Sequence, residues 1–582
     1  MKEWLRLLRA RIRLWSQSRV IKKGNEVPSW IPRFRRWVFG LAFLALGFLI
    51  FESGMRWQLP PVLKAASVML DYLVFAAFFT DAVLTFYYTF PKMRYFRTNW
   101  MDFFVFIPLL LHQVSLKTGA GLIVLRNIIV IVKVFTRSRK FTNLIRGVRL
   151  NTAQIVVLSF AATILIGTLL LTFPTATEDG RGAGFLDALF TSTSATCVTG
   201  LIVQDTPTYF STFGEVVILV LIQLGGLGIM TYSAFVAILF GRFSLGQRKI
   251  MQEMFEEEKD VLSMLTFILR MTLVIELAGV LVLFARWAFH FENTGQALYL
   301  SVFHSISAFC NAGFSLFSDS VSGFVSDPVV NVVIMLLIIL GGIGFIVVYE
   351  VTARARHRKR YLSPHTKIVL LTSAVLIAAG FFILFFFEFD GALMPLPLHG
   401  KLWASLFQSV TTRTAGFNTI PIGSLSSLTL SIMILLMFIG ASPGSTGGGI
   451  KTSTFAILLL SVRSILKGKP AVEAFKRTIP ASSVLKALAL LVSALFIVGM
   501  VFFLLLMSED QPYLELLFET VSAFGTVGLS TGVTPSLTAV GKLLITALMF
   551  LGRIGPLTLG LALARSIQTD RIDYPEARIM IG

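Results

Sequence analysis

The stretch TSTSATCVTGL, residues 191–201, consists of small and hydroxylated residues and ends in a glycine, yet it lies between two long apolar segments. Three stretches of similar character follow it: HSISAFCNAGF from His304, QSVTTRTAGF from Gln408 and ETVSAFGTVGL from Glu519. Such residues favour caps and turns over helix interiors. Their recurrence at similar places therefore indicates one structural unit that is used four times.

The composition is that of an integral membrane protein. Of the 582 residues, 55% are hydrophobic and only 14% are charged, and the mean hydropathy is +0.79. Apolar runs of about 20 residues, enough to cross a hydrocarbon core of ~30 Å, recur without the short alternation that is typical of barrel strands. We therefore predict an all-α integral membrane protein.

The formal net charge of +20 reflects topology. Basic residues cluster in alternate connectors, for example at positions 6–36 and 137–149. This asymmetry follows the positive-inside rule and predicts that both termini are cytoplasmic. No separate role in nucleic-acid binding is needed to explain the charge.

The chain divides into a block of spans and a repeating unit. We predict N-terminal spans near 37–55, 64–90, 100–115 and 121–136, which form a transmembrane block over 1–150. A unit of span, polar dip and span then recurs over 151–243, 244–356, 357–470 and 471–582. Each second span carries a small-residue motif, in order IQLGGLGIM, IILGGIGFI, MFIGASPGS and MFLGRIGPL. Two motifs that recur in the same order predict a fourfold pseudosymmetric pore of four membrane-pore-membrane repeats.

The chemistry of the dips indicates an ion path. Each dip begins with an apolar run long enough for a half-length helix and ends in a glycine loop. Non-helical backbone survives at membrane depth where it lines water or is buried in protein. Rings of backbone carbonyls can replace the hydration shell of K⁺, and glycine adopts the positive φ angles that such loops need. We predict that hydroxyls of the half-length helices brace a selectivity filter formed by Val198, Thr199, Gly200, Asn311, Ala312, Gly313, Thr414, Ala415, Gly416, Thr526, Val527 and Gly528.

These motifs carry a family resemblance. SATCVTGLIVQDT, HSISAFCNAGFSL, TTRTAGFNT and SAFGTVGLS resemble the four filter segments of the Trk/Ktr/HKT superfamily of potassium transporters. GASPGSTGGGIKTST from Gly440 and DYPEARIMIG from Asp573 resemble its KtrB-type membrane subunits more narrowly. The resemblance covers 150–582. It implies potassium uptake through the bacterial inner membrane by a homodimer with one pore in each protomer. It also implies control by a cytosolic KtrA-type ring that binds the nucleotide (ATP or ADP), with Na⁺ as a candidate coupling or activating ion.

A glycine-rich segment interrupts the second span of the third unit. At roughly 1 kcal/mol per glycine relative to alanine, it does not stay helical. A phosphate-binding loop is the alternative, but the segment lacks the G-x-x-x-x-G-K-[ST] spacing and a preceding strand. The resemblance makes it the gate beneath the filter, formed by Gly440, Ser442, Pro443, Gly444, Ser445, Thr446, Gly447, Gly448, Gly449 and Lys451.

Four charged residues are further candidates. Arg553 stands at membrane depth and is predicted to be a barrier to cations in the inner pore, the alternative being a structural charge satisfied by carbonyls or a carboxylate. Asp205, just beyond the first filter segment, either concentrates cations at the outer mouth or is an ordinary solvated acid. Arg413 and Glu519 lie on neighbouring pore segments, where they are hypothesised to pair.

The third dip differs in length from the first. It is one residue shorter between Phe407 and Gly416 than the first is between Phe190 and Gly200. This difference puts the equivalence of its half-length helix in question.

The N-terminal block has its own resemblance. RTNWMDFFVFIP from Arg97 and the following span with Arg126 and Lys133 resemble the third and fourth helices of a voltage sensor. A regular series from Arg126 would continue through positions held by Ile129, Val132 and Phe135. Because sensing needs several charges inside the field, we predict a weakly sensor-like packing or regulatory block.

Two other function classes can be weighed. A secondary carrier working by alternating access typically has inverted repeats, whereas units of two spans and a dip keep one orientation and favour a pore. An enzyme is not predicted, because the six histidines and the scattered acids form no metal or nucleophile constellation. Without a Rossmann-like unit in its sequence, the chain is expected to need a partner for nucleotide control.

Overall fold

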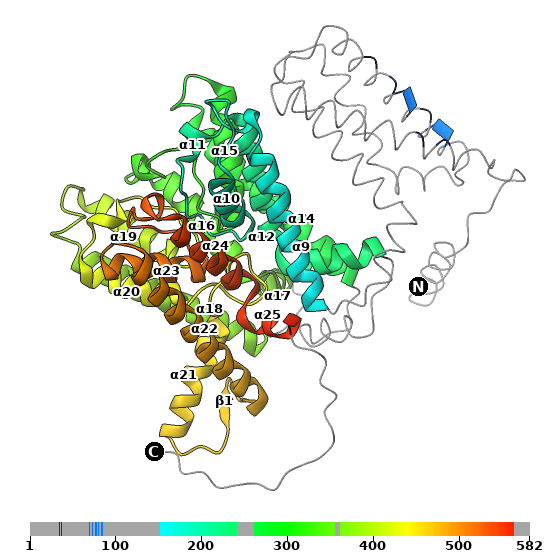
Figure 1. Ribbon diagram of the computed structural model, residues 1–582. Coiled ribbons are helices and arrows are strands. Elements are labelled where there is room, and N and C mark those ends of the chain that lie inside the picture. Colours follow the sequence, from blue (N-terminus) through cyan, green and yellow to red (C-terminus); the bar gives the residue numbers. More distant parts are fainter. Residues whose placement is uncertain are drawn as a thin grey trace, which may run out of the picture. The chain divides into compact units, whose positions relative to one another are not determined.

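The computed structural model describes residues 152–240, 261–355 and 361–563, with isolated positions between 34 and 84. The chain separates into two units, one of 1–149 with 173–175 and one of 150–172 with 176–582. The predicted N-terminal spans and the sensor-like segment from Arg97 lie outside the described residues, apart from those isolated helical positions. The all-α membrane fold is confirmed, since helices form nearly all regular structure in the described ranges (Figure 1).

A long apolar helix opens each repeat. These helices are α9 (Thr152–Leu171), α14 (Val261–Trp287), α18 (Pro364–Phe387) and α22 (Ala481–Ser508). All four are long and apolar enough to cross a bilayer. Many of their leucines and phenylalanines are exposed, for example Leu273 and Phe496, as expected where lipid replaces water around the protein.

A shorter helix follows each of these spans. The four are α10 (Phe185–Thr196), α15 (Thr294–Phe309), α19 (Leu398–Thr411) and α23 (Tyr513–Gly525). Each packs on the first span of its own repeat and on the second span of the preceding repeat, α10 on α24, α15 on α12, α19 on α16 and α23 on α20. The contact of α10 with α24 joins the first repeat to the last, so the helices form a closed ring.

The second spans are broken in all four repeats. They comprise α12 (Thr212–Phe240), α16 (Pro328–Ile343) with α17 (Phe345–Ala355), α20 (Ser427–Phe438) with α21 (Thr452–Leu466), and α24 (Ala539–Ile554) with α25 (Pro556–Leu563). The breaks lie at Gly228, Gly344 and Gly555, with φ of 76°, 102° and 87°, and at 439–451. Of these four breaks, only the one in the third repeat was predicted from the sequence. The last glycine of each L-G-x-x-G motif combines a positive φ with an extended ψ, a non-helical conformation that glycine adopts readily.

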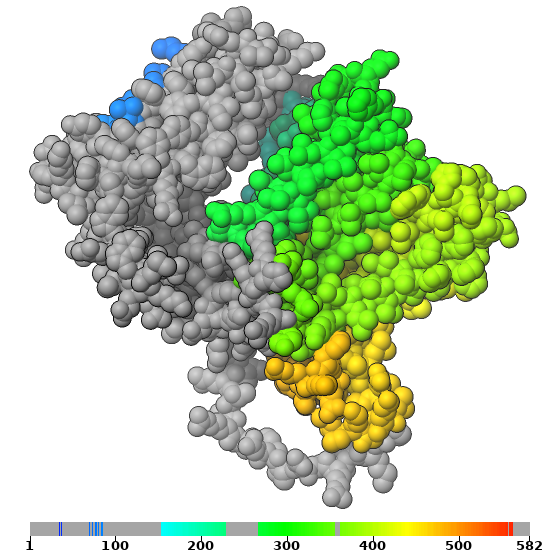
Figure 2. All heavy atoms as spheres, turned by 180° about the vertical axis from the view of Figure 1, so that it is seen from behind, coloured from blue at the N-terminus to red at the C-terminus, as the bar shows by residue number. Residues whose placement is uncertain are grey.

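The remaining elements are short. They are α11 (Thr206–Tyr209), the three-residue 3₁₀ turns η2 (Pro174–Ala176), η3 (Ser322–Phe324), η4 (Ile422–Ser424) and η5 (Thr534–Ser536), and strands β1 (Val472–Ala474) and β2 (Arg477–Ile479). The two strands form an antiparallel hairpin whose turn residues, Phe475 and Lys476, both have positive φ. This geometry is that of a type I′ turn. The segment of α21 and the hairpin, gold to orange in Figure 2, projects from the helical body.

A repeated close contact fixes the half-length helices to the first spans. In the second repeat, Ser305 of α15 donates to the carbonyl of Glu276 at 2.7 Å, and Gly279, one turn along α14, faces the same hydroxyl and the side chain of Leu337. The first and third repeats have the same arrangement, in Ser192 with Gly167 and Leu221, and in Ser409 with Gly380 and Leu436. Small residues allow this approach of helices in membranes.

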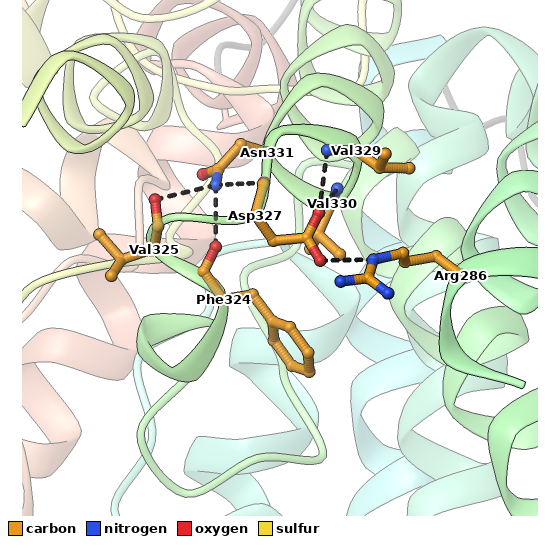
Figure 3. Close-up of polar contacts among 7 residues, drawn as sticks. All are labelled: Arg286, Phe324, Val325, Asp327, Val329, Val330 and Asn331. Carbon is orange, nitrogen blue, oxygen red and sulfur yellow. Dashed lines mark hydrogen bonds and ion pairs between the residues drawn. The ribbon is translucent and has the colours of Figure 1, made fainter. Parts of the chain in front are cut away.

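The end of the first span is tied to the start of the second. In the second repeat, Arg286 donates to the carboxylate of Asp327 at 2.7 Å, and the same carboxylate caps α16 by accepting from the backbone N–H groups of Val329 and Val330 (Figure 3). Asn331 donates to the carbonyls of Phe324 and Val325 and so fastens the preceding turn. Capping of this kind satisfies N–H groups that have no partner inside the helix.

The third and fourth repeats make the same connection between first and second span, but the acidic residue lies on the other helix. Glu388, at the end of α18, accepts from the N–H and hydroxyl of Ser426 at 3.0 and 2.7 Å. Glu509, at the end of α22, accepts from the N–H and hydroxyl of Thr538. The acid now stands on the first span and the capping hydroxyl on the second. The function of the tie is thus retained although the residue types differ.

The Gly279 contact yields a stability prediction. In Gly279→Val, the new side chain would meet both Leu337 methyl groups, at 2.9 and 3.1 Å from Cβ, and the Ser305 hydroxyl. Overpacking of this kind costs typically ~1–3 kcal/mol, so the purified protein should lose its monodisperse state at a lower temperature. Gly499→Val, at a glycine with nothing within 4 Å of an added Cβ, is the control. Equal thermal stability of the two variants would contradict the proposed packing role.

Candidate functional site

The loops after the four half-length helices share one backbone conformation. In each, a non-glycine residue with positive φ is followed two positions later by a glycine with positive φ. The pairs are Val198 and Gly200, Asn311 and Gly313, Thr414 and Gly416, and Thr526 and Gly528, with φ values of 57° and 96°, 59° and 71°, 68° and 80°, and 50° and 88°. All twelve predicted filter residues belong to these loops, and all but Gly313 are buried. The repetition seen in the sequence is therefore also a repetition of backbone geometry.

The four glycines are neighbours in a closed ring. A Cβ added to each would lie under 3.0 Å from a carbonyl oxygen of the next loop, in the order Gly200 to Ala312, Gly313 to Ala415, Gly416 to Val527 and Gly528 to Thr199. The last contact returns to the first repeat. Any side chain would push the backbones apart, and φ between 71° and 96° disfavours one in any case. The predicted filter residues of all four repeats are thus brought together.

Buried hydroxyls hold each loop from behind. Ser194 accepts from the N–H of Gly200 at 3.0 Å, and Ser307 donates to the carbonyl of Phe314 at 2.7 Å. Ser522 makes both contacts in the fourth repeat, accepting from Gly528 and donating to Leu529. The bracing role expected for these hydroxyls is confirmed by these bonds. They satisfy polar groups that would otherwise be buried without a partner.

The third repeat compensates for its missing residue. Thr411, one position closer to its glycine than the serines are to theirs, donates to the carbonyl of Phe417 at 2.6 Å. The helix α19 packs on α18 and α16, as its counterparts pack on theirs. The doubt about this half-length helix is therefore resolved. A threonine shifted by one position takes over the bracing contact.

The predicted gate residues form a loop between α20 and α21, as the glycine content indicates. Its two ends are joined where the N–H of Gly440 donates to the carbonyl of Ile450 at 2.9 Å. Ser442 and Thr446 donate their N–H groups to the carbonyls of Gly342 and Gly341, which lie in the second repeat. Within the loop, Ser445 donates to the carbonyl of Ser442, and Lys451 donates to the carbonyl of Gly447 at 2.7 Å. Pro443, Gly444 and Gly449 complete the loop, and the carbonyl of Gly444 accepts from the N–H of Phe345.

Arg553 reaches across from the fourth repeat. It is 6% exposed and lies in the last turn of α24. Its guanidinium donates to the carbonyls of Thr446, in the loop between α20 and α21, and of Gly225, in α12 of the first repeat. The side chain therefore joins three repeats. Carbonyl partners were one of the two alternatives for this residue, and they leave its positive charge in place beside the loop.

Three other residues are placed as follows. Asp205 accepts hydrogen bonds from Thr208 and, across repeats, from Ser318, each at 2.7 Å. Within the described ranges, Arg413 and Glu519 form no ion pair, so the hypothesis that they pair was wrong. Arg413 donates to the carbonyl of Gly440. Glu519 instead accepts from Ser530, Thr531 and Thr534, which lie in the segment that follows the glycine loop of the fourth repeat.

The sequence left one feature of the site unnoticed. In the first, second and fourth repeats, the first glycine of the second-span motif packs against a carbonyl in the last turn of the half-length helix, Gly225 against Thr196, Gly341 against Phe309 and Gly552 against Phe524. The recurrence of L-G in these three motifs was the sequence signal that could have predicted this contact.

Among the residues that the structure describes, no group of three His, Cys, Asp or Glu side chains could hold a metal.

Comparison with known proteins gives consistent matches. The family described as TrkH, Cation transport protein, matches residues 123–573. The chain is 42% identical over 443 residues to Ktr system potassium uptake protein B of Bacillus subtilis (strain 168), covering 75% of this chain and 98% of that protein. It is 41% identical over 435 residues to the protein of the same name from Vibrio alginolyticus, covering 74% and 94%.

Two further matches extend the comparison. Potassium/sodium uptake protein NtpJ of Enterococcus hirae is 37% identical over 446 residues, covering 75% of this chain and 98% of that protein. The crystal structure of the potassium transporter TrkH from Vibrio parahaemolyticus matches with a TM-score of 0.57, covering 92% of this chain and 99% of that chain. At 16% sequence identity, this last match shows the fold alone.

The bracing hydroxyls can be tested by Ser522→Ala. The substitution leaves the N–H of Gly528 and the carbonyl of Leu529 buried without this partner, which costs ~1–3 kcal/mol for each group. We expect a lower temperature of thermal unfolding in detergent. Ser431→Ala, which removes an exposed hydroxyl bonded only within its own helix, should have little effect. A wild-type unfolding temperature for Ser522→Ala would show that the hydroxyl does not support the loop.

Proposed function

Because the chain belongs to the family of TrkH cation transport proteins and is a potassium uptake transporter of the Ktr/Trk type, we propose that the ring of four glycine loops is its selectivity filter. The single observation that carries the proposal is the closed ring itself. Four separate repeats contribute the same pair of positive-φ residues, and a Cβ added to any of the four glycines would lie under 3.0 Å from a carbonyl oxygen of the next loop. The chain transports rather than catalyses.

In this proposal, K⁺ sheds water and is held by backbone oxygens. Carbonyls of the residues before the glycines, Thr199, Ala312, Ala415 and Val527, supply part of the cage. Side chains at these positions need only fill space behind the loop, which agrees with their small or apolar nature and complete burial. A cage of carbonyl dipoles replaces the hydration shell without a fixed charge that would hold the ion too tightly.

The degree of discrimination between K⁺ and Na⁺ follows from the same loops. Each repeat supplies one glycine at the ring, and the residues beside that glycine carry side chains. The carbonyl cage is therefore expected to be less uniform than one built from loops with two glycines each. We expect selection for K⁺ that is moderate, and we retain Na⁺ as a coupling or activating ion. A relative at 37% identity is named a potassium/sodium uptake protein, which supports testing both ions.

The loop of residues 439–451 acts as the gate in this scheme. Arg553 links it to α12 through the carbonyls of Thr446 and Gly225. Its charge opposes the passage of cations, and its two hydrogen bonds hold the loop in place. Release of the loop would therefore remove a steric barrier and free the arginine to move aside.

Assembly and control complete the proposal. We assign the chain to the cell inner membrane with both termini cytoplasmic, on the distribution of basic connectors. Two protomers form a homodimer with one pore each, and a cytosolic KtrA-type ring that binds ATP or ADP acts on the gate loop. The naming of two relatives as protein B of a Ktr system supports a partner subunit.

The filter can be tested by Gly313→Ser. At φ 71°, the added Cβ would stand 2.8 Å from the Cα of Gly416 and 2.9 Å from the carbonyl oxygen of Ala415. In cells that lack their own potassium uptake systems, we expect a higher half-saturating K⁺ concentration and a lower ratio of K⁺ to Na⁺ uptake. Gly499→Ser, on an open face of α22, should match the wild type.

Two results would count against the filter. One is an unchanged half-saturating concentration together with an unchanged ion ratio in Gly313→Ser, with normal insertion in the membrane. The other is absence of potassium uptake by the intact protein when the regulatory ring is supplied. Either result would return the secondary carrier to consideration.

The barrier can be tested by Arg553→Gln. Loss of the positive charge and of one bridging arm should raise the maximal rate of K⁺ uptake, by about tenfold for every ~1.4 kcal/mol by which the barrier falls. Arg463→Gln, at an exposed arginine in the last turn of α21, provides a charge-matched control. An unchanged or lower maximal rate in Arg553→Gln at normal expression would exclude a barrier role.

A further inference from the structure

Four strained residues lie beside the glycines of the ring. Val198, Asn311, Thr414 and Thr526 all adopt positive φ without being glycine. For a β-branched residue, as three of them are, this conformation is a clear outlier. Strained residues of this kind persist only where their surroundings determine their conformation. The groups that contact these four side chains are therefore candidates for holding the loops in shape.

Three consecutive residues of the gate loop make those contacts. The hydroxyl of Thr446 and the side-chain amide of Asn311 are hydrogen bonded at 3.0 Å. The backbone N–H of Gly448 donates to the hydroxyl of Thr526 at 2.9 Å. Gly447, between them, faces the Thr414 side chain so closely that an added Cβ would overlap its hydroxyl. One short segment thus meets the strained residue of the second, third and fourth repeats.

The two glycines are needed for approach rather than for backbone freedom. In this loop Gly444 and Gly449 have positive φ, whereas Gly447 and Gly448 do not. A Cβ on Gly448 would lie 2.5 Å from the hydroxyl oxygen of Thr526 and 2.8 Å from its methyl carbon. The loop therefore fits the underside of the ring only without side chains at these positions. A loop that only blocked the pore would not need to fit so closely against the residues beside the ring.

The first repeat differs in a way that fits this pattern. Its strained residue, Val198, has no hydrogen-bonding group, and its methyl would lie 3.0 Å from a Cβ on Gly225 of α12. Gly225 is also the residue whose carbonyl accepts from Arg553, which in turn donates to Thr446. All four strained residues are thus contacted by the loop or by the helix to which Arg553 ties it.

We propose that Thr446, Gly447 and Gly448 are positioning residues of the ion filter, so that discrimination between K⁺ and Na⁺ depends on the seated gate loop. The inference rests on the filter function proposed above. While the loop is seated, it fixes Asn311, Thr414 and Thr526 and with them the spacing of the carbonyls. When the loop withdraws, conduction rises and the ring loses these contacts, so selectivity falls.

The test is Thr446→Val, which removes the hydroxyl and keeps the shape. The full-length protein with its regulatory ring is expressed in cells without their own potassium uptake, and K⁺ and Na⁺ uptake are measured separately. We expect the ratio of K⁺ to Na⁺ uptake to fall by about fivefold, the factor that loss of one net hydrogen bond corresponds to. Thr446→Ser, which keeps the hydroxyl, should retain the wild-type ratio.

Two more variants separate positioning from general damage. Thr546→Val removes another buried threonine hydroxyl, one bonded only to the carbonyl of Lys542 in its own helix, and should leave the ratio unchanged. Gly448→Ala, which displaces Thr526, should lower the ratio as Thr446→Val does. It carries the test if Thr446→Val fails to reach the membrane.

The outcomes distinguish this inference from the filter proposal. If Gly313→Ser lowers the ion ratio while Thr446→Val and Gly448→Ala change only the rate of uptake, the loop gates without positioning and the inference is overturned. If Gly313→Ser also leaves the ratio unchanged, the filter proposal itself fails. A lower ratio in all three variants, with the wild-type ratio in Thr446→Ser, supports both.

Discussion

Four backbones can meet around one axis only if no side chain stands between them. At Gly200, Gly313, Gly416 and Gly528, a single added carbon would collide with the neighbouring loop, and the backbone is already in a conformation that disfavours one. Much of the rest of the structure serves this meeting point. The half-length helices end at it, three of the second spans place glycines against those helix ends, and the loop of residues 439–451 lies against the residues beside it.

A polar site at membrane depth has to satisfy its own hydrogen bonds, because lipid offers none. The serines and threonines that look out of place in the sequence do this work, since Ser194, Ser307, Thr411 and Ser522 all bond to the backbone of their own loop. A second set of hydroxyls bonds to the first spans in three repeats. These buried hydroxyls therefore satisfy the hydrogen bonds of the loop backbone and also fix the position of each loop.

Sequence reasoning reached the features that repeat within the chain. The four glycine loops, their hydroxyl braces and the interruption at 440–452 were predictable, because carbonyl geometry requires glycine and small residues at fixed spacing. Features that depend on register between distant segments were not. The contact of Thr446 with Asn311 and the partners of Arg413 and Glu519 appear only once the repeats are assembled. The breaks at Gly228, Gly344 and Gly555 were missed because apolar residues continue past them, and the hairpin because its turn, Phe475–Lys476, contains no glycine.

The central claim is that the carbonyl ring is where the permeating ion sits. The most direct measurement is anomalous diffraction from crystals of the protein grown in Rb⁺ or Tl⁺, which substitute for K⁺. The account predicts an anomalous peak on the axis enclosed by the carbonyls of Thr199, Ala312, Ala415 and Val527, which weakens when Na⁺ replaces the heavy ion. A well-ordered ring without such a peak, with the ion bound elsewhere in the membrane-spanning region, would contradict it.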